Sequence, residues 1–331
     1  MNPSPALLLS ALAALVVAGI AASLCVGPAG ISPGHVVAAL IGNGSEAERI
    51  IVFELRAPRA ALAVLIGGAL GLCGAALQGY LRNPLAEPGL IGVSASGALG
   101  AVMVLYTGLA GAFALALPLG GIIGAGIGVL AVQLLAGRAT GPLTLILAGI
   151  AVTSFAGALT ALALNLVPSP FAALEIVFWM MGSLADRSLS HVWLAGPFII
   201  IGGVLLATTG RALDALTLGE DSAATLGFNL AKLRTRIVGG TALAVGAAVA
   251  VAGAIGFVGL VVPHLLRPLT GHRPSALLAA SALGGAALTL AADVTVRLIT
   301  PAGELKLGVV TALIGAPLFL QLVLKQRRLL T

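Results

Sequence analysis

The residues best suited to do chemistry are polar groups set between long apolar stretches. The clearest polar segment, residues 211–234, reads Arg-Ala-Leu-Asp-Ala-Leu-Thr-Leu-Gly-Glu-Asp-Ser-Ala-Ala-Thr-Leu-Gly-Phe-Asn-Leu-Ala-Lys-Leu-Arg. Glu220 and Asp221 suit the start of a helix, where the backbone dipole favours carboxylates, and Gly227 suits a helix end. The pattern predicts two short helices that offer a polar contact surface to a partner protein.

A second polar stretch, residues 78–97, contains two helix-breaking prolines, Pro84 and Pro88. Asn83 and Gly89 suit a tight turn beside them. Irregular backbone at membrane depth persists only where it is buried in protein or lines a cavity. The stretch therefore predicts a rigid corner, which is either a gate on a transport pathway or a plain turn between helices.

The groups that would drive transport or hydrolysis are missing. The chain has three lysines, none of which follows a glycine, so it lacks the phosphate-binding loop of an ATPase. Apolar segments hold almost no carboxylates, which proton- and ion-coupled carriers need. Asp293 is an exception near a segment end, and its i, i+4 spacing to Arg297 predicts an ion pair. A stand-alone secondary transporter is disfavoured, as is an intramembrane metalloprotease, which needs a His-Glu-x-x-His type motif.

The elements that position these residues are apolar helices. Of 331 residues, 59% are hydrophobic and 8% are charged, and the apolar blocks are about 20 residues long. Alternating ten-residue strands are absent, so the fold class is an all-α polytopic membrane protein of about ten spans. The predicted spans are 6–26, 59–81, 92–108, 117–137, 143–166, 191–209, 236–256, 258–271, 275–298 and 305–325. A further segment, 168–190, lies between the fifth and the sixth.

The distribution of Lys and Arg orients the spans with both termini in the cytoplasm. The inner set is Arg82, Arg138, Arg211, Lys232, Arg234, Arg236, Arg267, Arg273, Lys325, Arg327 and Arg328. The outer set is Arg49, Arg56, Arg59, Arg187, Arg297 and Lys306. Excess positive charge inside obeys the positive-inside rule and explains the net charge of +6 without nucleic-acid binding.

The N-terminal region predicts two further helices. Residues 1–26 contain no Lys or Arg, so we expect a transmembrane helix there and not a signal peptide. In the outer loop 27–58, Ser32-Pro33 and then Gly42 predict a helix of about nine residues on the outer surface.

A weak internal repeat is also present. Gly74, Ala75, Leu81 and Pro84 match Gly253, Ala254, Leu260 and Pro263 at an offset of 179 residues. The predicted topology runs the two copies in opposite directions across the membrane. The match indicates either chance or an inverted repeat, which is common in transporters.

These motifs together resemble the FecCD-type permeases of type II ABC importers, which move iron–siderophore complexes, haem and cobalamin. The resemblance covers residues 50 to 325 and is especially close to the cobalamin branch. It is carried by Arg56-Ala-Pro-Arg59, Gly74-Ala-Ala-Leu-Gln78, Arg82-Asn-Pro-Leu-Ala-Glu-Pro-Gly89, Trp179-Met-Met-Gly182, Leu218-Gly-Glu220, Leu226-Gly227, the run Gly253 to Arg267, Ala292-Asp293, Arg297, and Gly308 to Pro317.

The resemblance implies partners. These are a second copy of the chain, two cytoplasmic ATPase subunits and a periplasmic binding protein, with membrane lipid around them. The resemblance also implies that outer basic residues receive acidic residues of the binding protein. At the matching positions stand Arg56, Arg59 and Arg297. The alternative for each is a solvated or lipid-facing cation, or for Arg297 a pair with Asp293.

The resemblance further assigns roles on the cytoplasmic side. The gate positions map onto Asn83, Leu85, Thr140 and Gly141. The segment 211–234 corresponds to the element that couples to the ATPase, through Leu218, Gly219, Glu220, Ala223, Leu226 and Gly227. The alternative for this segment is a solvated connector.

The sequence thus predicts one transmembrane permease domain, residues 1–331, in the inner membrane of a bacterium. It would be the passive subunit of an ATP-driven importer for a bulky metal chelate. We expect no cofactor and no metal site in this chain, with ATP and Mg bound by the partner subunits. The two cysteines, Cys25 and Cys73, sit apart without metal-ligand spacing.

Overall fold

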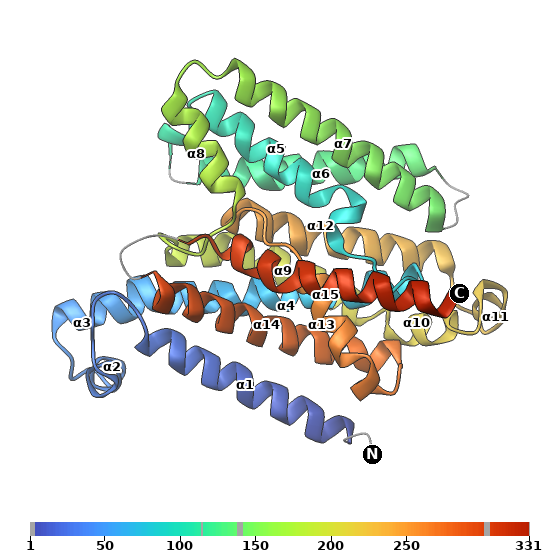
Figure 1. Cartoon of the computed structure of the whole chain (residues 1–331), viewed down its shortest axis with the longest axis horizontal. Helices are drawn as coiled ribbons and strands as arrows, with labels where there is room; N and C mark the ends of the chain where they lie inside the picture. The colour runs from blue at the N-terminus through green and yellow to red at the C-terminus, as the bar shows by residue number, and fades with distance from the viewer. Residues whose placement is uncertain (1–3, 114, 138–141, 301–304, 331) are drawn as a thin grey trace.

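The structure, a computed structural model, describes residues 4–330 except 114, 138–141 and 301–304. Every regular element in these described residues is helical (Figure 1). The long helices are α1 (Pro5–Cys25), α4 (Ala57–Tyr80), α5 (Val93–Tyr106), α6 (Ala116–Ala136), α7 (Pro142–Leu166), α9 (Leu189–Ala207), α12 (Leu230–Ala252), α14 (Pro274–Ile299) and α15 (Leu307–Leu330). The shorter ones are α2 (Pro33–Leu40), α3 (Glu46–Ile50), α8 (Pro170–Met180), α10 (Gly210–Leu216), α11 (Glu220–Thr225) and α13 (Val258–Leu266). Irregular turns of helix are η1 (Ile51–Arg56, a π-helix), η2 (Pro88–Ile91), η3 (Leu109–Gly111) and η4 (Pro268–Thr270).

The all-α fold class is confirmed, and each predicted span coincides with a helix in the described part of the chain. Seven described helices are long and apolar enough to cross a membrane. The eighth predicted span is the exception in form, because α13 has 9 residues and continues as η4. At 1.5 Å per residue α13 covers about 14 Å, less than half of a ~30 Å hydrocarbon core. It must therefore sit inside the bundle, and its residues Val258–Pro263 are buried.

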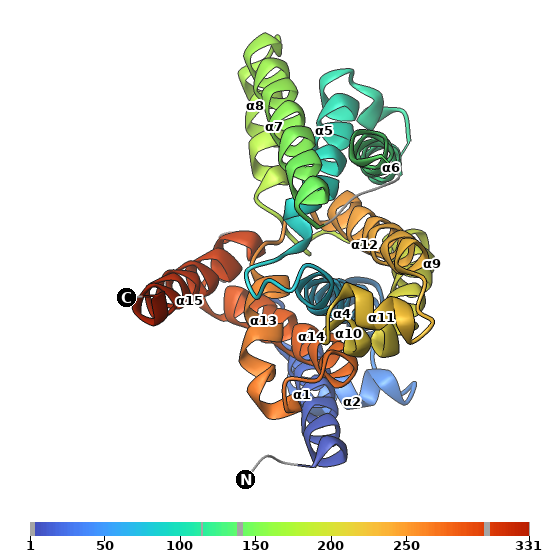
Figure 2. The ribbon, with the colours of Figure 1, turned by 90° about the vertical axis from the view of Figure 1, so that its right-hand side faces the viewer.

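The helices form two groups joined by α12 and α9. Viewed along the bundle in Figure 2, α5, α6, α7 and α8 stand on one side, and α1, α4, α13 and α14 stand on the other, with α15 projecting from the second group. Figure 1 shows α2 and α3 at one end of the bundle and α10 and α11 at the opposite end, where α1 begins and α15 finishes. We call these the Arg297 end and the Asp214 end, after the residue that lies at each.

Glycine lets α4 and α14 approach with their backbones in contact. A Cβ at Gly71 would overlap the carbonyl of Ser281, and a Cβ at Gly67 would overlap that of Gly285. Lipid provides no hydrophobic force between helices, so close packing of small residues has to hold them together. Gly67 and Gly71 are four residues apart, so both lie on the face of α4 that meets α14.

The N-terminal region follows the prediction in part. The helix predicted after Ser32 is α2, and the Ser32 hydroxyl caps it by accepting the His35 N–H at 3.4 Å. The second span was placed from residue 59, but α3, η1 and α4 form one helical run of 35 residues, Glu46–Tyr80. The charged residues of α3 and η1 lower the hydropathy of this region, so a prediction from hydropathy starts the helix too late. A capping box between Ser45 and Glu48 marks it and is readable as Ser-x-x-Glu.

The predicted repeat does not pair similar elements at its offset. Gly74 lies inside α4, whereas Gly253 lies just beyond the end of α12 with φ +73°. Pro84 lies in a turn, whereas Pro263 lies within α13. The inverted repeat therefore remains a prediction that the matched positions do not support.

Candidate functional site

A basic recess opens at the Arg297 end. It has a volume of about 460 Å³, and its wall includes the loop after α1, the segment between α8 and α9, and parts of η1, α4 and α14. Among the described residues its charged lining is Glu54, Arg56, Arg59, Asp186, Arg187 and Arg297. With Asp293, which pairs with Arg59 and Arg297 behind the lining, four arginines stand against three acids, so the recess keeps an excess of positive charge.

A buried carboxylate organises two of these arginines. Asp293 is fully buried in α14, and its Oδ2 accepts the Arg297 Nη2–H at 2.7 Å, which confirms the pair predicted from their spacing. Its Oδ1 accepts Arg59 Nε–H and lies 2.8 Å from Arg59 Nη2. One carboxylate thus holds guanidinium groups from α4 and α14. The contact with Arg59 spans 234 residues, so local spacing could not reveal it.

Two of the arginines also cap the end of α1. Arg297 Nη1 donates to the carbonyls of Ser23 and Val26, at 2.9 and 2.8 Å. Arg56 Nη1 donates to those of Leu24 and Cys25, at 2.7 and 3.0 Å. The last carbonyls of a helix lack partners within the helix, and cations favour that end of the dipole. These arginines therefore bind α1 to η1 and α14.

The exposure of the three predicted docking residues differs as a result. Arg56 is 4% exposed and Arg297 is 8% exposed, so neither is a solvated or lipid-facing cation. The Arg59 side chain is 19% exposed and is the most accessible of the three. Arg187, which the sequence argument did not select, joins them in the recess through the loop before α9. The docking role of these residues remains a prediction.

At the Asp214 end, the corner predicted at residues 78–97 is irregular, as expected. The side chain of Asn83 accepts the Leu85 N–H at 2.9 Å, and Arg82 adopts a left-handed backbone with φ +47°. Burial raises the pKa of the Glu87 carboxyl in the same corner. The predicted gate positions Asn83 and Leu85 are both partly buried in this turn. The other two, Thr140 and Gly141, lie outside the described residues.

A hydrogen-bonded side chain joins this corner to α13. Gln78, near the end of α4, is buried and donates through Nε2 to the carbonyls of Gly259 and Leu260, at 3.4 and 3.3 Å. Its Oε1 accepts from Arg267 Nη2 at 2.6 Å. These contacts anchor α13, which is too short to span the membrane, against the end of α4.

The segment 211–234 forms the two short helices predicted, α10 and α11, but its last residues, 230–234, already belong to α12, which begins six residues before the predicted span 236–256. Gly219 and Gly227 flank α11 with φ +106° and +86°, a region that favours glycine. Leu218 and Leu226 are 68% and 60% exposed at either side of it. Ala223 faces inward and is fully buried, so it holds α11 in place and has no free surface for a partner.

Three glycines of the sequence motifs meet at a junction that spacing did not reveal. A Cβ at Gly182 would overlap the Ala254 carbonyl, one at Gly253 would overlap that of Trp179, and one at Gly308 would overlap that of Met181. The Ser183 N–H also donates to the Ala252 carbonyl at 2.7 Å. The beginning of α15, the end of α12 and the loop after α8 are therefore packed backbone to backbone.

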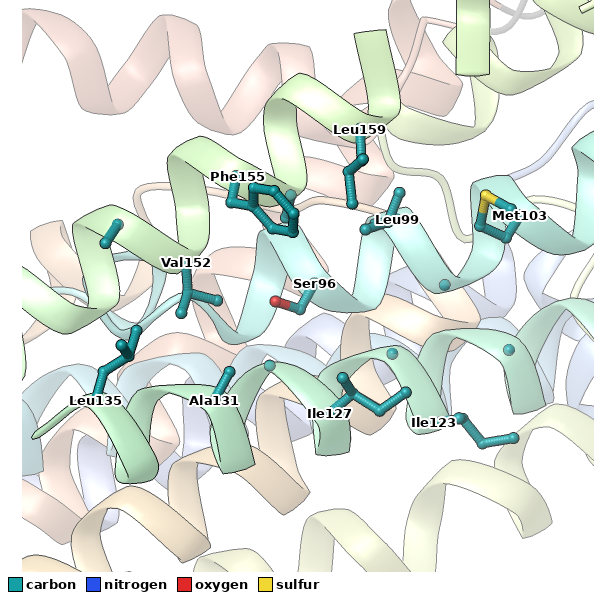
Figure 3. A pocket seen from close by; sticks show the side chains of 16 residues that line it. Ser96, Leu99, Met103, Ile123, Ile127, Ala131, Leu135, Val152, Phe155 and Leu159 are labelled. Carbon is teal, nitrogen blue, oxygen red and sulfur yellow. The ribbon is translucent and has the colours of Figure 1, made fainter. Parts of the chain in front are cut away.

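A groove of about 620 Å³ lies between α5, α6 and α7, and Figure 3 shows its lining side chains. Its floor includes Gly100, Gly124 and Gly128, and its rim includes the exposed side chains of Ile127 and Phe155. Ser96 contributes the hydroxyl visible in Figure 3, and no lining residue is charged. The groove offers surface to apolar groups.

The arrangement of the chain is that of a membrane permease. Apolar helices enclose irregular segments that are buried in protein, a basic recess lies at one end, and exposed short helices lie at the other. The family model described as the FecCD transport family matches residues 15–325. The chain belongs to this family.

Several known proteins are similar to it. The uncharacterised ABC transporter permease YvrB of Bacillus subtilis is 40% identical over 293 residues, which are 87% of this chain and 82% of YvrB. The vitamin B12 import permease BtuC of Salmonella typhimurium is 39% identical over 322 residues, 97% of this chain and 95% of BtuC. A solved structure described as an inward-facing, metal-chelate type ABC transporter matches with TM-score 0.85 and 31% identity, over 96% of this chain and 98% of that one.

Proposed function

We propose that this chain is the membrane-spanning subunit of an ATP-driven importer for a bulky metal chelate of the cobalamin, haem or iron–siderophore class. It would act as a homodimer in the bacterial inner membrane with both termini in the cytoplasm. Two ATPase subunits would supply the energy, and a periplasmic binding protein would deliver the chelate. The observation that carries the proposal is the similarity to vitamin B12 permeases over 97% of the chain.

The Arg297 end supports docking of the binding protein. Its recess gathers arginines from separate elements, and a field of one sign speeds association with an acidic partner. The arginines differ in their task, however. Arg56 and Arg297 bind the end of α1, while Arg59 is accessible enough to meet an incoming carboxylate.

The Asp214 end supports coupling to an ATPase. Leu218 and Leu226 are large apolar side chains that project from a polar segment. Exposed apolar residues rimmed by polar ones mark interaction sites. The two leucines would enter the ATPase surface, and the buried Ala223 would hold α11 against the bundle.

The experiment that tests the proposal is reconstitution into liposomes with and without a matching ATPase and binding protein. Uptake of labelled cobalamin, haem and a ferric siderophore is measured with ATP, without ATP, and under a proton gradient. We expect uptake of one chelate only when ATP, the ATPase and the binding protein are all present. Gradient-driven uptake by this chain alone would establish the rival function, a stand-alone secondary transporter.

A further inference from the structure

A short side-chain contact joins the coupling segment to the start of α14. Asp214 in α10 accepts the Ser275 N–H through Oδ1 at 2.8 Å and the Ser275 hydroxyl through Oδ2 at 2.6 Å. Ser275 is the second residue of α14, and Arg273, at the N-cap position, makes no side-chain capping bond. Asp214 therefore performs, from another helix, the capping that a helix start needs. A carboxylate there is also favoured by the helix dipole.

Packing around this contact leaves α10 little freedom to move alone. A Cβ at Gly210 would lie 3.1 Å from the Cβ of Ser275, which shows how closely α10 meets the start of α14. Leu213 is fully buried and packs against Gly79 near the end of α4. The helix α10 thus sits on the adjoining ends of α4 and α14.

Helices α4 and α14 form one rigid body. Their backbones touch at Gly67 with Gly285 and at Gly71 with Ser281, and the Thr289 side chain also packs against Gly67. Densely packed interiors transmit displacement instead of absorbing it. A shift of α14 must therefore carry α4 with it.

The same body reaches the basic recess at the Arg297 end. The helix α14 has 26 residues, so it is about 39 Å long at 1.5 Å per residue. In the last two turns of α14, Asp293 binds Arg59 of α4 and Arg297 of α14 itself. Both helices are therefore joined at the Arg297 end by a carboxylate, as α10 and α14 are at the Asp214 end.

We propose that Asp214 is the positioning residue through which the coupling segment moves α4 and α14 as one body, linking α10 to the Arg297 recess. The inference rests on the proposed function, which supplies the ATPase that moves α10. A rigid element that is biased at both of its ends makes the two sites influence each other reciprocally. Occupation of the recess by a binding protein would then shift α10, and the nucleotide state of the ATPase would change the affinity of the recess for the binding protein.

The alternative link is weaker. Arg82 in the corner lies 3.8 Å from Glu220 in α11, and both side chains are about half exposed. Exposed ion pairs at such distances contribute roughly 0–1 kcal/mol. The Asp214 bonds are shorter and charge-assisted, which makes each about twice as strong as a neutral bond. Transmission through Asp214 is therefore the stronger of the two.

The test uses the complete complex of permease, ATPase and binding protein in liposomes. The measured quantity is the ratio of ATP hydrolysis with the binding protein to hydrolysis without it. The variants are Asp214→Ala, Ser275→Ala and the double variant, and Thr208→Val is the control. Thr208 donates a hydroxyl bond to the Leu205 carbonyl at 2.7 Å within the end of α9, so the control removes a hydroxyl bond that joins no two elements. Thermal unfolding and co-purification of the ATPase are measured for each variant.

We expect Asp214→Ala to lower the ratio by roughly tenfold, within the 5–150-fold range typical of coupling between sites. Hydrolysis without the binding protein and co-purification should persist. Ser275→Ala removes only the hydroxyl bond and should have a smaller effect, whereas Asp214→Ala removes both bonds. The double variant should therefore be no worse than Asp214→Ala. Thr208→Val should keep the wild-type ratio.

Three results would overturn the inference: an unchanged ratio in Asp214→Ala, effects of the two single changes that add in the double variant, or a loss that merely follows a lowered unfolding temperature. Failure of the proposed function is distinguishable from these. In that case the wild-type complex itself would show no stimulation by the binding protein and no ATP-dependent uptake.

Discussion

The two ends of the bundle differ in how many of their predicted contact residues are taken up by internal bonds. At the Arg297 end, Arg56, Arg297 and Asp293 are buried; the two arginines donate to carbonyls at the end of α1, and Asp293 accepts from Arg297. At the Asp214 end, Asp214 is bonded to α14, but Glu220 and the two leucines that flank α11 are exposed. Both sets resemble contact residues in sequence, yet only one set is free to contact a partner.

This difference separates two kinds of effect that substitutions should have. A change at a buried charge pair removes an internal bond and leaves its partner uncompensated in a medium of low dielectric. A change at an exposed apolar side chain alters little in the free chain but removes surface from a complex. We therefore expect stability losses at the Arg297 end and losses of association at the Asp214 end.

Asp293→Asn should have the largest effect. It leaves the guanidinium groups of Arg59 and Arg297 close together without the carboxylate that separates them. Breaking a buried ion pair costs about 3–5 kcal/mol, so thermal unfolding of the purified chain in detergent should begin at a clearly lower temperature. Asp186→Asn, an exposed acid of the same recess, should stay within about 0.5 kcal/mol of wild type. Equal unfolding temperatures for the two variants would contradict the structural role of Asp293.

Leu226→Ala should have the next largest effect, on assembly. Anchoring side chains at the centre of an interface contribute about 2 kcal/mol or more, so affinity for the ATPase should fall roughly thirtyfold. The measurement is titration of the ATPase onto the permease in nanodiscs. Leu109→Ala is the matched control, because Leu109 is also exposed but lies in η3, between α5 and α6 and outside the coupling segment. Unfolding of either variant should be unchanged, and equal affinities would remove Leu226 from the interface.

Much of this fold could be predicted from local patterns. Apolar blocks predicted the helices, Ser32-Pro33 predicted α2, and Glu220, Asp221 and Gly227 predicted the bounds of α11. The pattern also gave the pair of Asp293 with Arg297, because both sit on one helix face.

What local patterns could not supply is contact between distant segments. Arg59 meets Asp293 across 234 residues, and Asp214 meets Ser275 across 61. Spacing identifies residues that share a helix face, but it carries no information on which two helices become neighbours. The sequence therefore places Arg56 among the outer docking residues, and only packing shows that its Nη1 donates to carbonyls at the end of α1.

A smaller effect is expected for Arg59→Gln, which tests whether the Arg297 end also serves association. A single partly exposed charge contributes about 1 kcal/mol or less, so docking of the binding protein should slow by roughly threefold at low salt. The loss should shrink as salt is added, because screening weakens steering. Arg49→Gln is the control, since Arg49 is exposed at the same end but outside the recess. Identical association rates for both variants would leave the recess with a structural role alone.

The smallest effect is expected at Glu87, in the corner at the Asp214 end. Burial raises the pKa of its carboxyl in the folded chain above the ordinary value of 4.5. The folded state then binds the proton more tightly than the unfolded state, so stability falls as pH rises from 4.5 through the raised folded pKa. Above that window the ionised carboxylate is a constant cost.

Glu87→Gln should therefore stabilise the chain at neutral pH by about 0.5 kcal/mol, the scale of a change that breaks no bond. Its advantage should vanish below pH 4.5, where wild-type Glu87 is protonated in both states. Thermal unfolding of both chains across this range measures it, and a variant less stable than wild type at neutral pH would show that the ionised carboxylate makes a stabilising contact in the corner.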